Sequence, residues 1–268
     1  MENRYQRQIQ LPEIGVAGMQ KLSDSSVLII GIGGLGTQTA QYLTGSGIGR
    51  IGLMDFDSVE LSNLHRQLLY REQNVGQLKT EIAQQQLSAL NSEIKIETYP
   101  VKLDNATALS VFTDYDIIVD GTDSIQARYI INDACRLLRK PWIFGSVNGF
   151  SGQWAVMDHS NNGVDYRNLF PTPPNPLTVQ NCTANGTIGP VPGITGTCQA
   201  LEVIKYIVGL NKTKNTLFTF DMLNNEIYAV EIPLDVESEF VPETPEAFLG
   251  FSYDNYCFGV KMNAEHGK

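Results

Sequence analysis

A glycine-rich turn and an acidic residue after it give the first indication of chemistry in this sequence. The stretch "GIGGLG" places Gly31, Gly33 and Gly36 at the G-x-G-x-x-G spacing, between a predicted strand and a predicted helix. Such glycines let the backbone approach a phosphate, and the amides at the helix start face the anion. Asp55 follows 19 residues after Gly36, where a carboxylate accepts hydrogen bonds from ribose hydroxyls. The pattern predicts a nucleotide site, whereas glycines kept only for a tight turn would leave Asp55 unexplained.

The residues beyond Asp55 favour a triphosphate over a nicotinamide. The three histidines of the chain form no arrangement that would serve hydride transfer. Cations recur instead in segments expected to face the nucleotide, namely at Arg7, Arg66 and Lys79. Asp123, at the end of another predicted strand, adds a hard oxygen ligand suited to magnesium. These residue types together indicate binding of ATP with Mg²⁺.

Alternating strand and helix patterns must position these residues. Apolar runs predict buried strands over residues 26–32, 50–56, 94–100, 115–123 and 141–147. Helical patterns fall between them, over residues 35–46, 75–90 and 125–138. The alternation predicts an α/β fold with a Rossmann-like, doubly wound, mainly parallel sheet.

The second part of the chain has a different pattern. Residues 152–158, 216–222 and 226–232 indicate antiparallel strands that continue the sheet, and a helix is predicted over about 193–208. The tail from Asp235, with its acids and prolines, is predicted to wrap over the surface.

Composition narrows the class of protein. A length of 268 residues suits one large α/β domain or two small ones. The net charge of -10 argues against a broad nucleic-acid surface, and no apolar run approaches the roughly 20 residues that span a bilayer. The four cysteines form no Cys-x-x-Cys pair and no signal-peptide pattern opens the sequence, so we expect a cytoplasmic protein.

In their order along the chain, these motifs resemble the MoeB/ThiF/HesA family, bacterial relatives of the ubiquitin-activating enzymes. The likeness runs through almost the whole chain, in "RYQRQIQLPEIG", "VLIIGIGGLG", "GIGRIGLMDFDSVELSNLHRQLLY", "VGQLKTE", "VDGTDSIQARYIIND", "NCTANGTIGPVPGITGTCQALEVIKYIVG" and "FDMLNNE". The resemblance implies an ATP-dependent adenylyltransferase. Its substrate would be the C-terminal glycine of a small ubiquitin-like sulfur carrier ending in Gly-Gly, ThiS-like or MoaD-like, in thiamin or molybdopterin biosynthesis.

The resemblance also assigns roles to residues. It implies that Asp55 holds the ribose, that Asn63 and Arg66 hold phosphates, that Lys79 neutralises developing charge and that Asp123 places magnesium. The other ATP-binding positions it implies are Gly31, Gly33, Gly34, Gly36, Asp57, Ser62, Leu64, His65 and Ser124. In family members the counterpart of Arg7 reaches the ATP of the partner subunit, which implies a homodimer.

By the same resemblance, the chain is expected to form a single adenylation domain over residues 1–268. The nucleotide-binding core would cover about residues 20–160. The carrier-binding part, with a crossover loop, would cover about residues 161–268.

The implied reaction explains why cations surround the predicted nucleotide site. A C-terminal carboxylate, with a pKa of about 3.3 to 3.7, is already ionised at pH 7 and needs no general base. The obstacle is repulsion from the triphosphate, about 4 kcal/mol for two unit charges about 4 Å apart at an effective dielectric of about 20. Fixed cations and a metal ion therefore have to bring the two anions together.

The cysteines of this chain differ from those of many family members in the two places where zinc is bound. Many relatives bind zinc with two Cys-x-x-Cys pairs, but residues 165–168 here are "DYRN" and the tail offers only Cys257, so no zinc is expected. Cys182 matches a cysteine that links covalently to the carrier in thiamin-pathway relatives. The alternative role for Cys182 is that of a small buried residue in a loop. Cys135 and Cys198 are expected in the core.

Several residues keep two interpretations at this point. Asp57 either caps the loop or orients a neighbouring residue, and a structural role of this kind is favoured for it. Arg128 reaches either the nucleotide site or Asp133. His65 is expected to pack rather than to transfer a proton. Three other functions also stay open: adenylation of a peptide or tRNA base, a catalytically silent carrier-binding partner, and a nicotinamide-dependent oxidoreductase.

Overall fold

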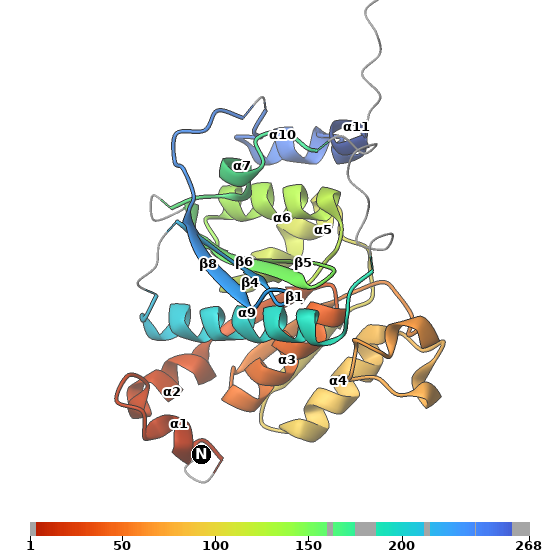
Figure 1. The fold of residues 1–268 in the computed structure, drawn as a ribbon, viewed down its shortest axis with the longest axis vertical. Coiled ribbons are helices and arrows are strands. Elements are labelled where there is room, and N and C mark those ends of the chain that lie inside the picture. The colour runs from red at the N-terminus through yellow and green to blue at the C-terminus, as the bar shows by residue number, and fades with distance from the viewer. Residues whose placement is uncertain (1–3, 160–162, 175–185, 212–214, 239, 259–268) are drawn as a thin grey trace, which may run out of the picture.

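The strands form one mixed sheet whose parallel half carries the glycine loop. The computed structural model describes residues 4–159, 163–174, 186–211, 215–238 and 240–258. Over these residues the sheet has eight strands in the order β3-β2-β1-β4-β5-β6-β7-β8 (Figure 1). The parallel strands are β1 (Ser26–Ile30), β2 (Arg50–Met54), β3 (Lys95–Tyr99), β4 (Ile117–Asp120) and β5 (Trp142–Asn148). The antiparallel continuation consists of β6 (Ser151–Met157), β7 (Thr216–Asp221) and β8 (Glu226–Glu231). The predicted fold class is confirmed.

Helices cover both faces of this sheet, which is why its central strands are continuous apolar runs. Every residue of β4 and all but the first of β1 are buried. On one face lie α3 (Gly34–Ser46), α4 (Lys79–Leu90) and α9 (Pro190–Val208), with α1 (Gln6–Ile9) and α2 (Gly15–Asp24) beyond them (Figure 1). On the other lie α5 (Asn105–Phe112) and α6 (Ile125–Leu138), and then α7 (Tyr166–Leu169), α10 (Pro245–Gly250) and α11 (Tyr253–Phe258). None of the helices in the described residues is long and apolar enough to cross a membrane.

The bounds of one predicted helix are confirmed by the structure, and the start of another is not. The helix predicted over residues 125–138 is confirmed as α6, because the Ser124 hydroxyl caps its start and Arg139 ends it in a left-handed conformation. The predicted start of α4 at residue 75 is wrong. Gly76 has a positive φ of 88°, and the Lys79 amide donates to the carbonyl of Asp57, so residues 75–78 pair with another loop and the helix begins at Lys79.

The C-terminal tail contributes to the core rather than only wrapping over the surface. Phe248, Tyr253 and Cys257 are buried against the cluster that contains residues of α5 and α6. The prediction of a surface segment is therefore incomplete. It was based on the acids and prolines of the tail and did not consider the aromatic side chains between them. Cys135 is buried in the same cluster, as predicted, while Cys198 is only half-buried.

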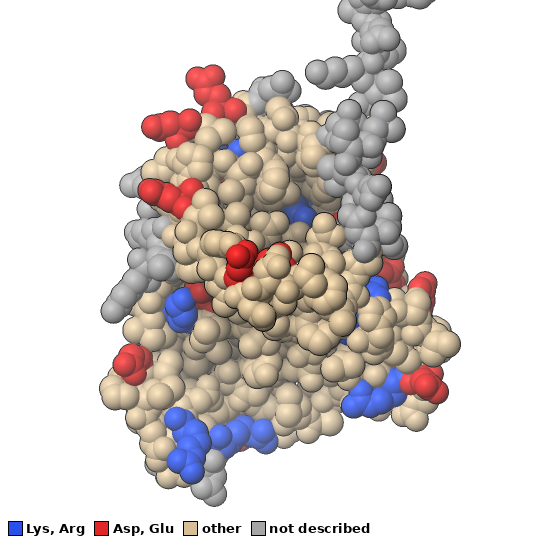
Figure 2. Space-filling view, viewed as in Figure 1, with Lys and Arg blue, Asp and Glu red and all other residues tan. Residues whose placement is uncertain are grey.

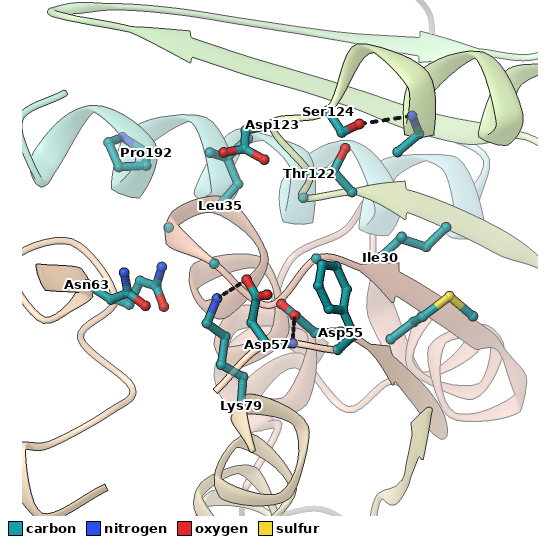
Figure 3. Close-up of a pocket in the computed structure, with 18 of the residues that line it drawn as sticks. Ile30, Leu35, Asp55, Asp57, Asn63, Lys79, Thr122, Asp123, Ser124 and Pro192 are labelled. Atoms are coloured by element: carbon teal, nitrogen blue, oxygen red, sulfur yellow. Dashed lines mark hydrogen bonds and ion pairs between the residues drawn. The ribbon is translucent and has the colours of Figure 1, made fainter. Parts of the chain in front are cut away.

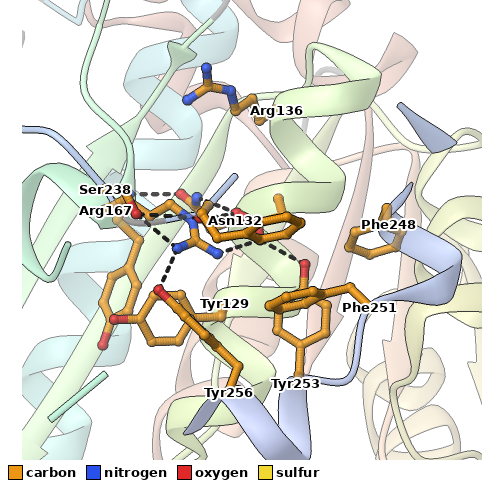
Figure 4. A network of polar contacts seen from close by, with 12 residues as sticks. Tyr129, Asn132, Arg136, Arg167, Ser238, Phe248, Phe251, Tyr253 and Tyr256 are labelled. Carbon is orange, nitrogen blue, oxygen red and sulfur yellow. Dashed lines mark hydrogen bonds and ion pairs between the residues drawn. The ribbon is translucent and has the colours of Figure 1, made fainter. Parts of the chain in front are cut away.

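Residues 165–168 join α6 to the tail through a buried ion pair. Asp165 caps α7, and the Arg167 guanidinium donates to both carboxylate oxygens of Asp133 at 2.8 and 2.7 Å. The Tyr253 hydroxyl donates to the same carboxylate at 2.6 Å, and Arg167 also donates to the Tyr256 hydroxyl at 2.8 Å (Figure 4). We call Asp133, Arg167, Tyr253 and Tyr256 the tail clamp. Of its members, Arg167 lies in the segment 165–168, where the sequence has no cysteine pair.

The edge of the parallel sheet carries a carboxylate with a strongly shifted pKa. Arg50, followed by Lys95, lowers the pKa of Glu97 to about 2. A carboxylate with a lowered folded-state pKa stabilises the fold above its unfolded pKa of about 4.3 and loses that contribution as the pH falls toward 2. We expect Glu97→Gln to cost at most about 1 kcal/mol at pH 6, because the pair is partly solvated. The difference in melting temperature from the unsubstituted protein should shrink steadily below about pH 4, and a difference that stays constant from pH 6 to pH 3 would contradict this assignment.

Candidate functional site

The glycine loop follows β1 and opens onto a cavity at the carboxyl ends of the parallel strands. Gly31 has a φ of 83°, and a Cβ atom there would lie 2.9 Å from the backbone of Gly121. At Gly36 a Cβ atom would lie 2.0 Å from the Gly31 carbonyl oxygen, so only glycine lets α3 start this close to the loop. The amino end of α3 therefore faces the cavity, where unpaired amides and the helix dipole favour an anion.

Asp55, which follows β2, ties the glycine loop to the next loop. One carboxylate oxygen accepts the amide of Ile32 at 2.7 Å, and the other accepts the amide of Asp57 at 2.9 Å. Burial raises the pKa of Asp55, and the positive charge of Lys79 opposes that rise. The carboxylate lies in the cavity wall, and each of its oxygens retains a lone pair for a hydroxyl donor.

Lys79 brings a buried positive charge to the floor of the same cavity. Its side chain is 7% exposed, and its ammonium lies 2.8 Å from a carboxylate oxygen of Asp57 (Figure 3). Asp57 is thus the partner of Lys79 as well as part of the cavity lining, which agrees with the structural role favoured for it. An ammonium held this way is oriented without a ligand and presents a fixed charge to one.

The segment after Asp57 supplies a second cation and polar side chains. Arg66 donates to the carbonyl of Ser62 at 3.0 Å and lies 2.8 Å from the His65 ring. Asn63 is buried, and its amide oxygen accepts the amide of Glu60, which closes the turn that carries Ser62 and Arg66. His65 is exposed and lines the cavity, with its ring against the Arg66 guanidinium, so any packing it provides is at the site surface.

Asp123 and Ser124 enter the cavity from the opposite side, between β4 and α6. The Asp123 carboxylate lies across the cavity from Lys79 and Asp57 (Figure 3). The described residues contain no group of three or more His, Cys, Asp or Glu side chains that could hold a metal ion by themselves. A single carboxylate next to a phosphate site does fit Mg²⁺, which usually keeps several waters and binds one or two carboxylates together with substrate phosphates.

The cavity that unites these residues has a volume of about 600 Å³, within the size range of small-molecule sites. Twelve of the fourteen predicted ATP-binding positions line it: Gly31, Gly33, Gly34, Asp55, Asp57, Ser62, Asn63, His65, Arg66, Lys79, Asp123 and Ser124. Three loops that are separate in the sequence therefore meet at one edge of the sheet.

Four predicted residues lie elsewhere or cannot be placed. Leu64 packs against the apolar core, and Gly36 lies behind the loop, where it permits the close approach of α3. Arg7 is exposed on α1 and is not part of the cavity lining; Figure 2 shows Lys and Arg side chains gathered at the end of the molecule formed by α1 and α2. Cys182 is outside the described residues.

The cavity also contains residues to which the sequence assigned no role. Gln67 is 3% exposed, and its side-chain oxygen has no hydrogen-bond partner within the described part of the chain. Lys102 adds a cation beyond β3, and Pro192 of α9 packs close to Gly34. The sequence did give a signal for Gln67, since it closes the stretch "DFDSVELSNLHRQ", but no pattern indicated Lys102 or Pro192.

Arg128 is directed toward the site rather than toward Asp133. Its guanidinium donates to the Asp120 carboxylate at 3.1 Å, while Asp133 is held by Arg167 of the tail clamp. Of the two interpretations that the sequence left open, the structure therefore supports the first.

Comparisons with known proteins agree with this fold. A sequence model described as the ThiF family matches residues 5–238. The "Sulfur carrier protein adenylyltransferase" of Thermus thermophilus is 43% identical over 260 residues, which cover 95% of this chain and 96% of that protein. The "Adenylyltransferase and sulfurtransferase MOCS3" of Aedes aegypti is 44% identical over 256 residues, 95% of this chain and 58% of that protein. The chain thus spans about half the length of several MOCS3 relatives.

Solved structures share the fold at lower identity. The crystal structure of E. coli MccB has a TM-score of 0.77 at 23% identity, with 91% of this chain and 72% of that chain covered. The structure titled "Crystal structure of E. coli MccB + ATP" has a TM-score of 0.75 at 25% identity, with 89% and 73% covered.

Proposed function

Because the chain belongs to the ThiF family, we propose that it uses ATP to adenylate the C-terminal glycine carboxylate of a small ubiquitin-like sulfur carrier protein. The observation that carries the proposal is the cavity itself, where the glycine loop, Asp55, Lys79 and Asp123 meet. The name of the Thermus relative, which aligns over nearly its whole length, supports the same reaction and substrate class.

In the proposed reaction one oxygen of the carrier carboxylate attacks the α-phosphorus of ATP. The bond from that phosphorus to the oxygen of the β-phosphate breaks, and pyrophosphate leaves with the electron pair. The carboxylate is already ionised at neutral pH, so no residue has to accept a proton from it. The task of the chain is to bind two anions next to each other.

Each cavity residue has a part in that task. The amides at the start of α3 and the Arg66 guanidinium hold phosphate oxygens, and Asp55 accepts the ribose hydroxyls. Lys79, held by Asp57, presents its ammonium to the α-phosphate, where charge builds up. Asp123 would hold Mg²⁺, which when bound neutralises charge on the leaving pyrophosphate.

We further propose a homodimer in which Arg7 serves the nucleotide of the partner subunit. Arg7 is exposed on α1 and lies outside the cavity lining of its own chain. The resemblance to family members, in which this arginine acts across the dimer, supports the proposal. Cys182 stays a candidate for covalent linkage to the carrier.

The function is tested by the exchange of labelled pyrophosphate into ATP, with Mg²⁺ and each of several acceptors. We expect exchange with a carrier that ends in Gly-Gly, ThiS-like or MoaD-like, and the preferred carrier identifies the thiamin or molybdopterin pathway. The matched control is the same carrier without its last glycine, which should support at most about 1% of the exchange, because the attacking carboxylate is then misplaced.

The other outcomes identify the rival functions. Exchange that occurs with a peptide or a tRNA, but with none of the carriers, would show that the protein adenylates that acceptor instead. Carrier binding without any exchange would indicate a catalytically silent partner. Binding of NADH, with no exchange for any acceptor, would indicate an oxidoreductase and overturn the proposal.

A further inference from the structure

The loop between β4 and α6, residues 121–124, is held by a buried ion pair that no part of the proposed reaction uses directly. We propose that Arg128 and Asp120 form a positioning pair, which fixes this loop so that Asp123 can hold the metal ion of the metal–nucleotide complex. The inference rests on the proposed function, because it concerns how the same site acquires its metal affinity.

Asp120 anchors the beginning of the loop. It is the last residue of β4 and is fully buried. One carboxylate oxygen accepts both the amide and the hydroxyl of Thr122, at 2.8 and 2.7 Å, and the other accepts the Arg128 guanidinium at 3.1 Å. Burial raises the pKa of Asp120, and Arg128 opposes the rise, so the arginine favours the ionised carboxylate on which the loop is folded.

Arg128 holds the same loop from α6. Its backbone amide donates to the carbonyl of Ser124, and its guanidinium donates to the carbonyl of Thr122 at 3.0 Å and to that of Gly145 in β5 at 3.3 Å. Asp120 and Arg128 together therefore engage the amide, the hydroxyl and the carbonyl of Thr122. A planar guanidinium with several donors in a fixed fork suits this arrangement, and a lysine ammonium does not reproduce it.

Neighbouring elements keep the pair in place. Gln199 of α9 donates to the carbonyl of Asp120 at 2.7 Å and to that of Ile143 in β5 at 3.2 Å. The Arg128 guanidinium also lies 5.3 Å from the centre of the Phe144 ring. The loop is thus fixed from β4, β5, α6 and α9.

Asp123 lies between two fixed residues of this loop. Thr122 before it is held by the pair, and Ser124 after it caps α6 through the amide of Ala127. Asp123 itself is exposed and points into the cavity (Figure 3). Because Mg²⁺ requires nearly octahedral geometry with ligands at about 2.0 to 2.1 Å, a small shift of this loop is enough to weaken its binding.

The tail clamp offers a matched control for a purely structural effect. Arg167–Asp133 is also an arginine–aspartate pair with side chains almost fully buried, 3% and 0% exposed against 8% and 0% for Arg128–Asp120. It lies outside the cavity lining. Arg128→Lys and Arg167→Lys should therefore destabilise the fold to a similar extent, and only the first should change the response to Mg²⁺.

The experiment measures the Mg²⁺ dependence of two quantities, ATP binding by calorimetry and carrier-dependent pyrophosphate exchange, alongside melting temperatures. We expect Arg128→Lys to raise the half-saturating Mg²⁺ concentration about tenfold, with exchange partly recovered at high Mg²⁺, and Arg167→Lys to leave it unchanged. An unchanged Mg²⁺ dependence in Arg128→Lys, or an equal shift in both variants, would overturn the proposal.

Two features keep the test decisive. If Arg128→Lys does not fold, Thr122→Val takes its place, because it removes one hydrogen bond to Asp120 and keeps the shape of the side chain. Thr122→Val should raise the half-saturating Mg²⁺ concentration about threefold. An unchanged Mg²⁺ concentration would count against the positioning pair. If the protein supports no exchange with any carrier, the proposed function fails, but the calorimetric Mg²⁺ dependence of ATP binding still decides whether the pair positions Asp123.

Discussion

Lys79→Ala is expected to lower carrier-dependent pyrophosphate exchange by about 10²-fold or more, because it removes a fixed charge from the site where the two anions meet. Its ammonium is nearly buried and already oriented by Asp57, so little reorganisation is needed when charge develops. The loss should appear mainly in the maximal rate, whereas the affinity for ATP, supported by the glycine loop and Arg66, should change less.

A second lysine provides the control for this substitution. Lys95 also forms an ion pair with a carboxylate, Glu97, but it is 68% exposed on β3 and outside the cavity lining. Lys95→Ala should retain full exchange. If Lys79→Ala also exchanged at the full rate, Lys79 would have no role at the α-phosphate.

The same variant tests whether the sites are shared between subunits. If Arg7 acts on the nucleotide of the partner, co-expressed Arg7→Ala and Lys79→Ala chains form mixed dimers with one intact site. Such a mixture should regain about one quarter of the normal exchange, since about half of the dimers are mixed and each has one active site of two. Recovery no greater than the average of the two parent variants would show that Arg7 does not act across a dimer.

Arg167→Met is expected to destabilise the protein by about 3 to 5 kcal/mol, because it leaves the buried Asp133 carboxylate without its cation. For a chain of this size, that loss lowers the melting temperature by roughly 6 to 20 °C. Arg136→Met removes another arginine–aspartate pair from α6, but Arg136 is 31% exposed, so we expect a loss of at most about 1 kcal/mol.

A compensating substitution separates the charge from the packing of the clamp. In Arg167→Met with Asp133→Leu, both charges are absent, and much of the lost stability should return, as an apolar replacement of a buried pair often permits. A double variant no more stable than Arg167→Met alone would show that the unpaired charge of Asp133 is not the cause of the lost stability.

Where a feature depends on neighbours in the sequence, prediction from sequence succeeded. The bounds of α6 follow from Ser124 at its cap and from its apolar periodicity, and the glycine loop follows from the spacing of Gly31, Gly33 and Gly36. Parallel strands place their carboxyl ends at one edge of the sheet, so residues that follow β1, β2 and β4 were expected to meet there. The structure brings Asp55, Lys79 and Asp123 together at that edge.

The partners of individual side chains could not be predicted in this way. The sequence left Arg128 with either the site or Asp133 as its partner, and it gave no reason for Leu64 to turn toward the core or for α4 to begin at Lys79. These choices depend on packing between separate segments, which competes with local preference.

The sequence by itself determined the fold class and the set of residue types needed to bind a nucleotide, because periodicity, glycine spacing and capping act over a few residues. Only the tertiary structure decided which charges are paired. Arg167 and Asp133 are 34 positions apart and Tyr253 lies 120 positions from Asp133, so their contacts exist only after the chain has folded. Burial then makes each such pair strongly dependent on its partner, since a charge removed from water is stable only when another group compensates it.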